Sequence, residues 1–225
     1  MTQCADMFPA VETRDLAAVQ GEVGSIFEAL FPEAESGFIA ESFGWAEQWF
    51  TGRYPGYQAI DARYHDLEHT LQGTLALARI LRGRHFSGVR PILTPMAFEL
   101  GLFAILMHDT GYLKRTDDTE GTGAKYTATH VRRSGEFAKD FLTRKGFAAA
   151  DTLAVQNMIR CTGVNVDLTA IPFANELERT VGFALGTADL LGQMAATDYV
   201  DKLPVLFLEF AEAAKFRKST GSLST

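Results

Sequence analysis

The chain has 225 residues, a length that fits one large domain or two small ones. Its formal net charge of -7 argues against long nucleic acid or an anionic membrane surface as a partner. With 47% hydrophobic residues and only 7 prolines, it is neither a disordered nor a collagen-like protein. Only Cys4 and Cys161 are present, too few for a disulfide scaffold, and the first residues have no signal-peptide pattern. We therefore expect a cytoplasmic protein.

Apolar residues recur at helical spacing along most of the chain, and the alternating runs typical of strands are missing. The sequence predicts an all-α fold. The predicted helices cover residues 13–30, 37–50, 59–82, 94 to about 111, 130–145, 150–161, 173–195 and 205–216.

Three regions are expected along the chain. Residues 1–53 form an N-terminal helical extension packed on the core, 54–217 form the main domain, and 218–225 form a disordered Ser/Thr/Gly-rich tail. The polar, glycine-bearing segment 114–124 is expected to be a loop. No apolar segment reaches the roughly 18 residues of a membrane span, so no membrane contact is expected.

Four histidines occur in patterns that suggest a metal site. His65 and His69 are four residues apart in Tyr64-His-Asp-Leu-Glu-His69, so on a helix they share one face. His108 and Asp109 are adjacent and would point about 100° apart on a regular helix. Because Gly111 indicates that the helix ends there, the relaxed backbone can let both side chains approach one ion.

A carboxylate inside a later apolar helix completes the pattern. Asp189 lies in the apolar run from Val181 to Leu191, where an unpaired carboxylate is costly unless it binds a cation or strong donors. Asp198, nine residues later, is the alternative candidate for this ligand, and Asp189 is preferred because its surroundings are more apolar. Imidazoles and carboxylates without thiolates suit one or two divalent ions such as Mn, Mg, Zn, Fe or Co.

The order of these residues resembles that of the HD-domain metal-dependent phosphohydrolases. The resemblance covers roughly residues 54–210, is strongest at Leu106-Met-His-Asp-Thr-Gly-Tyr112, and extends to His130-Val-Arg-Arg-Ser134 and Met158-Ile-Arg-Cys-Thr162. Tyr64-His-Asp-Leu-Glu-His69 also resembles the YHNxxH element of the cyclic-nucleotide phosphodiesterases. The HD-GYP signature of cyclic-di-GMP phosphodiesterases is absent after Asp109.

The resemblance implies an HD-like helical bundle that hydrolyses a phosphate ester of a small molecule, with a nucleotide favoured, as a monoesterase or diesterase. It implies that His69, His108, Asp109 and Asp189 hold one metal and that Asp109 bridges toward a second. The metal would lower the pKa of a bound water for attack on phosphorus, and His65 would be the general acid. The residues implied as catalytic are His65 and Asp109, and the candidates for substrate contact are His130, Lys125, Arg132 and Arg133.

Two other functions remain open at this point. One is a regulatory or ligand-binding HD module that keeps the metal but does not turn over, and the other is an HD-type di-iron oxygenase. Between the His-Asp pair and the final Asp, His130 is the only histidine, whereas such oxygenases usually have two. Structural roles also remain open for His65, as a residue bonded to Asp61 at the start of a helix, and for the arginines, as a solvated face. A homodimer is compatible with the sequence.

Overall fold

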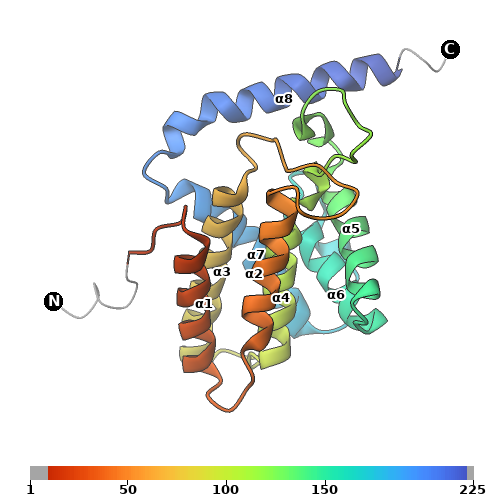
Figure 1. The fold of residues 1–225 in the computed structure, drawn as a ribbon. Coiled ribbons are helices and arrows are strands. Elements are labelled where there is room, and N and C mark those ends of the chain that lie inside the picture. Colours follow the sequence, from red (N-terminus) through yellow and green to blue (C-terminus); the bar gives the residue numbers. More distant parts are fainter. Residues whose placement is uncertain (1–9, 222–225) are drawn as a thin grey trace.

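The computed structural model describes residues 10–221, and within this range it confirms the predicted all-α fold (Figure 1). Cys4 lies outside the described residues. This part of the chain contains no strand, only an isolated bridge between Tyr57 and Arg115. The helices are α1 (Leu16–Leu30), α2 (Gly37–Phe50), α3 (Leu67–Phe86), α4 (Pro95–Met107), α5 (His130–Arg144), α6 (Ala149–Arg160), α7 (Glu176–Met194) and α8 (Tyr199–Gly221), with short 3-10 turns η2 (Thr110–Tyr112), η3 (Gly123–Tyr126) and η4 (Leu168–Ala170).

Helix α4 is the centre of the bundle. It packs against α2, α3, α6 and α7, and every residue from Leu100 to Met107 is buried. Thr94 begins the helix as predicted, because its hydroxyl accepts a hydrogen bond from the Ala97 N–H and Pro95 occupies the first turn. Since His108 and Asp109 directly follow α4, its burial holds them in the interior.

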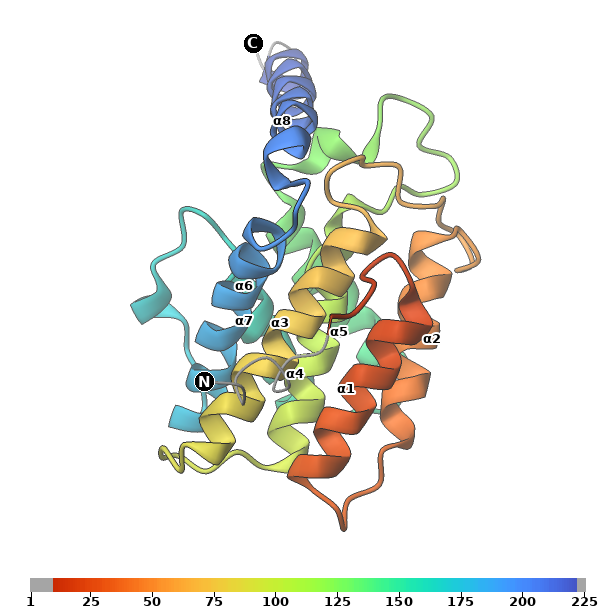
Figure 2. The same ribbon diagram turned by 90° about the vertical axis from the view of Figure 1, so that its left-hand side faces the viewer.

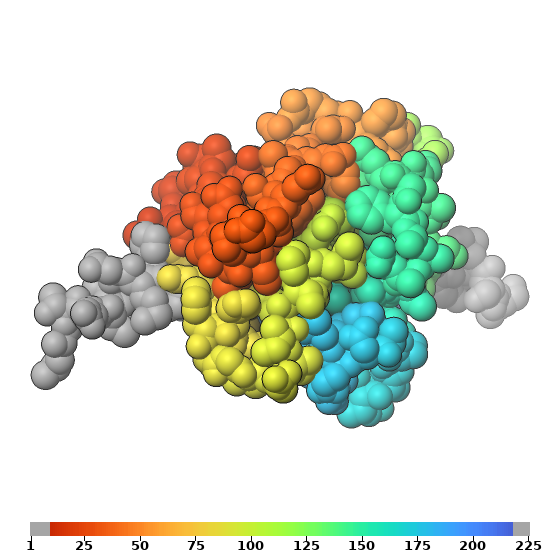
Figure 3. Space-filling view, turned by 90° about the horizontal axis from the view of Figure 1, so that it is seen from below, coloured from red at the N-terminus to blue at the C-terminus, as the bar shows by residue number. Residues whose placement is uncertain are grey.

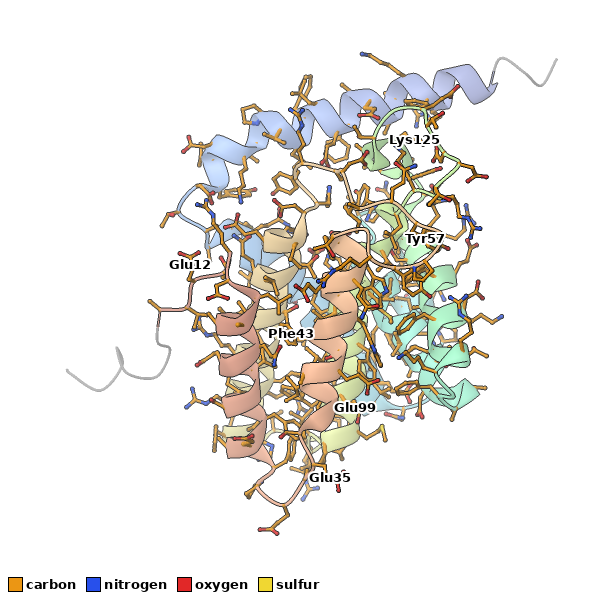
Figure 4. All side chains as sticks on the ribbon, in the orientation of Figure 1. Glu12, Glu35, Phe43, Tyr57, Glu99 and Lys125 are labelled. Carbon is orange, nitrogen blue, oxygen red and sulfur yellow. The ribbon has the colours of Figure 1, made fainter. Side chains whose placement is uncertain are left out.

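The N-terminal helices share this hydrophobic core. Phe27 of α1 contacts Phe98 at 5.3 Å between ring centroids, and Trp45 of α2 contacts Phe103 at 5.5 Å. Figures 1 and 2 show α1 and α2 lying along α3 and α4, and in Figure 4 Phe43 lies inside the bundle. Seen from the end opposite α8, side chains of the first four helices and of the segments near α6 and α7 close the bundle (Figure 3).

The beginning of α3 differs from its prediction. The helix begins at Leu67, eight residues after the predicted start at Ala59. The Asp66 carboxylate accepts a hydrogen bond from the His69 N–H, so Asp66 caps the helix and the preceding segment is irregular. His65 therefore lies outside the helix, and the prediction that His65 and His69 share a helical face was wrong.

Helix α8 is longer than predicted. It begins at Tyr199, contains Pro204 and continues to Gly221, four residues into the segment expected to be a disordered tail. Pro204 is the sixth residue of α8, past the first turn, so the helix continues through it without the backbone hydrogen bond that an N–H at this position would donate. The remaining tail residues, 222–225, lie outside the described range. Among the described helices, none combines the length and apolar character needed to cross a membrane.

Candidate metal centre

Three segments bring the predicted ligands together. His69 lies in the first turn of α3, where the Asp66 cap fixes the backbone, and Asp189 projects from α7. His108 follows the last residue of α4 in a helical conformation, whereas Asp109 has φ -107° and ψ 7° and leads into η2. This departure from helical geometry lets adjacent side chains face one point, as predicted from the Gly111 position.

Four atoms from these residues form a ring. The Nε2 atom of His69 lies 3.3 Å from Asp109 Oδ2 and 3.1 Å from Asp189 Oδ1. The Nε2 atom of His108 lies 3.2 Å and 3.3 Å from the same two oxygens. Two ligand atoms bound at about 2.1 Å to one ion are separated by about 3.0 Å at a right angle and about 3.4 Å at a tetrahedral angle. Each edge of the ring thus has the length expected for two ligands of one ion. His69, His108 and Asp109 each offer a ligand atom within 4.8 Å of the other two. Asp189 is not part of that group and joins the ring through the two histidines.

The donor set also fits a divalent cation. His108 Nε2, Asp109 Oδ2 and Asp189 Oδ1 are buried, and none makes a hydrogen bond of good geometry with any described residue. Such atoms are rare in protein interiors because each costs desolvation energy. His69, His108 and Asp109 are nearly inaccessible, and the Asp189 side chain is 13% exposed. The residues present therefore fit a bound metal of the imidazole–carboxylate class.

The outer hydrogen bonds of His108 prepare it as a ligand. Its Nδ1 lies 2.7 Å from the backbone carbonyl of Ile105, which can only accept, so Nδ1 carries the proton. The lone pair of Nε2 then points into the ring, which is the arrangement typical of metal-bound histidines.

Without an ion, the four side chains balance their charges by protonation. Burial lowers the pKa of His69, but the carboxylates of Asp109 and Asp189 raise it more, to about 9. The pKa of His108 is likewise raised by these two carboxylates against the effect of burial. Burial raises the pKa of Asp109 and of Asp189, yet the imidazoles hold both below the usual range.

A second group of side chains lies beside the ring. The His65 and Tyr112 rings are stacked with centroids 4.5 Å apart, and the Tyr112 and His130 rings are stacked at 4.8 Å. The His130 Nδ1 donates to the Thr127 carbonyl at 2.6 Å, and its Nε2 lies 3.9 Å from Asp109 Oδ1. The side chains of His65 and His130 are 14% and 17% exposed, so they lie on a more open side of the site than His69 and His108.

Helix α8 contributes a residue that the sequence reading missed. The Glu209 carboxylate lies 2.6 Å from His65 Nδ1 and accepts a hydrogen bond of 2.7 Å from the Tyr64 N–H. His65 thus bonds to Glu209, not to Asp61. The sequence signal was a lone carboxylate in the apolar run from Leu203 to Phe210, the same signal that identified Asp189.

The basic side chains predicted to contact substrate bind elsewhere in the structure. Lys125 pairs with Asp118 and also donates to the Glu120 carbonyl. Arg132 is exposed and pairs with Glu136 on α5. Arg133 donates to the carbonyls of Gly111 and Leu113, both at 2.7 Å, and its guanidinium lies over the Tyr126 ring. Arg133 thus supports the turn after Asp109, and a phosphate contact is assigned to none of the three.

A small pocket lies beside His69, on the side of α7 and α8. It is lined by Tyr64, His69, Gln72, Gln193, Ala196, Tyr199 and Lys202. Lys202 pairs there with Glu68 at 3.0 Å and with Asp198 at 3.4 Å, and Arg14 also pairs with Asp198. Asp198 therefore belongs to a surface ion-pair network, and it is Asp189 that faces the two ring histidines.

Comparison with known proteins gave one match. A search of curated proteins and a search of solved structures each found none. A family model described as Npun_R2479-like matches residues 55–222, a range that includes all four ring residues and Glu209. The chain belongs to the Npun_R2479-like family.

Proposed function

We propose that this protein is a divalent-metal-dependent phosphohydrolase of the HD type that cleaves a phosphate ester of a small molecule, with a nucleotide as the favoured substrate. The observation that supports it is the ring of His69, His108, Asp109 and Asp189, in which each imidazole nitrogen lies 3.1–3.3 Å from the two carboxylate oxygens. Beside the ring, His65 has its own carboxylate partner. The sequence resemblance to HD-domain enzymes and the convergence of the same residues both support metal-dependent hydrolysis of a phosphate ester.

The ring residues would hold the ion, and His65 would donate a proton to the leaving group. When bound, a divalent ion lowers the pKa of water and offsets negative charge on a phosphate ester. The Glu209 carboxylate would accept a hydrogen bond from the Nδ1–H of His65 and hold the imidazole stacked on Tyr112. A proton on His65 Nε2 is then available to the leaving oxygen of the ester, which is general acid catalysis.

The test is hydrolysis by the full chain after reconstitution with Mn²⁺, Zn²⁺ or Fe²⁺. The substrates are p-nitrophenyl phosphate, bis-p-nitrophenyl phosphate and a panel of nucleotides, which separate monoesterase from diesterase activity. We expect Asp109→Asn to abolish turnover together with metal binding. His65→Gln should retain the metal and lower kcat by about 10²–10⁴, the usual contribution of a general acid.

Asp198→Asn is the matched control, because this carboxylate lies in the surface network and should leave hydrolysis unchanged. Metal binding without hydrolysis of any ester would instead support a regulatory module. Two iron ions per chain with oxygen consumption would support the oxygenase.

A further inference from the structure

The outer face of α8 carries apolar side chains that remain exposed in the described part of the chain. Val200 and Phe207 are 71% and 70% exposed, Phe210 is 52% exposed and Leu203 is 38% exposed. Isolated exposed apolar residues are ordinary, but a contiguous group on one helix indicates an interaction surface.

These residues follow the spacing of a helix–helix seam. Val200, Leu203, Phe207, Phe210 and Ala214 are separated by three, four, three and four residues, which is the a/d pattern of a coiled coil over two heptads. All five are exposed, and no charged residue occupies any of these positions. We call this set the α8 seam. Such a pattern fits another helix better than it fits an extended peptide.

The opposite face of α8 is already occupied. Glu209 binds His65 and the Tyr64 N–H, and Glu212 accepts hydrogen bonds from the Thr122 N–H and hydroxyl at 2.6 and 2.8 Å. Figures 1 and 2 show α8 lying across one end of the bundle, with its length projecting beyond the other helices. The helix is thus held through its polar inner face, while its apolar face points away from the bundle.

We propose that the α8 seam packs against the α8 seam of a second copy of this chain in a two-fold symmetric dimer. A helix seam without charges is complementary to itself, which is what an isologous interface requires. A standard interface buries about 800 Å² per partner, and a fully buried Phe accounts for about 150–250 Å² of apolar surface. Phe207 and Phe210 lie at the centre of the seam and, with Val200 and Leu203 beside them, supply the apolar centre of such an interface.

A membrane surface fits the seam less well. Helices that lie on membranes carry an excess of Lys and Arg along the polar face, whereas α8 has nearly as many acidic residues, Asp201, Glu209 and Glu212, as basic ones, and the chain has a net charge of -7. The family match extends to residue 222 and so includes the whole seam.

Sedimentation velocity of the full chain over a range of concentrations tests the proposal. We expect a dimer for the wild type and at least a tenfold weaker association for Phe207→Glu, with unchanged helix content by circular dichroism. Val164→Glu is the matched control, because Val164 is 91% exposed but lies outside the seam, and this variant should remain dimeric.

A second variant tests the contact directly. Phe207 is at the centre of the seam, so Phe207→Cys in a Cys4→Ser background should form a disulfide-linked dimer under mild oxidation, whereas Val164→Cys should not. A monomeric wild type at all concentrations, or a Phe207→Glu variant that remains as dimeric as wild type, would overturn the proposal. A monomer that co-sediments with phosphatidylcholine–phosphatidylserine vesicles would also overturn it and assign the seam to a membrane.

Discussion

Asp189 and Asp198 are nine residues apart, yet their surroundings assign them to different tasks. Asp189 Oδ1 is buried next to His69 and His108 and makes no hydrogen bond with a described residue. Asp198 pairs with Arg14 and Lys202 at the surface. A metal ligand must give up water, which is less costly for a carboxylate that the fold has already desolvated.

We therefore expect Asp189→Asn to lose bound metal and Asp198→Asn to keep it. An amide oxygen carries no net charge and is a weaker ligand for a divalent ion than a carboxylate. Elemental analysis of both purified variants beside the wild type measures the metal per chain. Full metal content in Asp189→Asn would remove this residue from the centre.

Metal binding should displace protons from the ring. With its pKa raised to about 9 by the neighbouring carboxylates, His69 is protonated at neutral pH in the metal-free protein. A histidine ligand must be neutral, so the apparent affinity for Zn²⁺ should rise between about pH 6 and pH 9, by up to about tenfold per pH unit for each proton displaced. Above the pKa of His69 this contribution should level off.

Calorimetric titration with Zn²⁺ in buffers of different ionisation enthalpy measures the proton release. We expect at least one proton per ion near neutral pH. An affinity that does not change with pH would show that the ring histidines are already neutral or that they do not bind the ion.

At the residue scale, the side chains that the sequence predicts to meet do lie together. His108 and Asp109 were predicted to converge at the end of a helix, Asp189 was predicted to need a partner among its apolar neighbours, and the structure places all three side by side. Glu209 was missed as a site residue because its role depends on where α8 lies in space, and nothing near it in the sequence indicates His65. The partners of Lys125 and Arg133 could not be predicted for the same reason, since they lie on segments whose placement the sequence does not show. Their substrate contacts stay a prediction.

At the scale of elements, the turn after α4 controls the geometry of the centre. Gly111 donates its N–H to Ser134 Oγ at 2.8 Å, and its carbonyl accepts from Arg133, so α5 holds this turn on both sides. A Cβ atom at Gly111 would lie 2.0 Å from the His130 carbonyl oxygen. The sequence indicated Gly111 as a helix stop, but its main constraint is this close approach to α5.

Gly111→Ala should therefore destabilise the protein by about 1–3 kcal/mol or more and weaken metal binding, because backbone must move to relieve the overlap. Gly135→Ala is the matched control on α5, where an added Cβ meets nothing within 4 Å. It should stabilise the protein by about 0.5–1 kcal/mol through helix propensity. Urea unfolding of both variants measures the difference, and equal stability would contradict the close approach.

The errors in helix boundaries have a common cause. Hydrophobic spacing locates the middle of α3 and α8 well, but their ends depend on single residues. The Asp66 side chain begins α3 at Leu67, and Pro204 is accommodated inside α8 although proline usually marks a break. The later start of α3 places His65 in the segment before the helix, where it contacts Glu209.

At the scale of the whole molecule, the centre joins helices that are far apart in the sequence. Its residues come from α3, the turn after α4 and α7, the same helices that surround the buried core. The all-α fold and the shared core follow from the apolar periodicity of each helix. Which helices pack against each other does not follow from that periodicity, because amphipathic faces of similar width can pair in several ways.

This placement predicts that an ion stabilises the whole fold. An ion bound by these residues links three segments in the folded state alone, and at a free concentration of one hundred times Kd it adds about 2.7 kcal/mol to the free energy of unfolding. For a chain of this size that corresponds to a rise in Tm of about 5–10 °C.

Thermal unfolding with and without added Zn²⁺ or Mn²⁺ measures this rise. His69→Ala should abolish it and Asp198→Asn should preserve it, since His69 is part of the ring and Asp198 is not. A rise that persists in His69→Ala would mean that the ion acts at another site. The shift would then say nothing about the ring, and the assignment would depend on metal content alone.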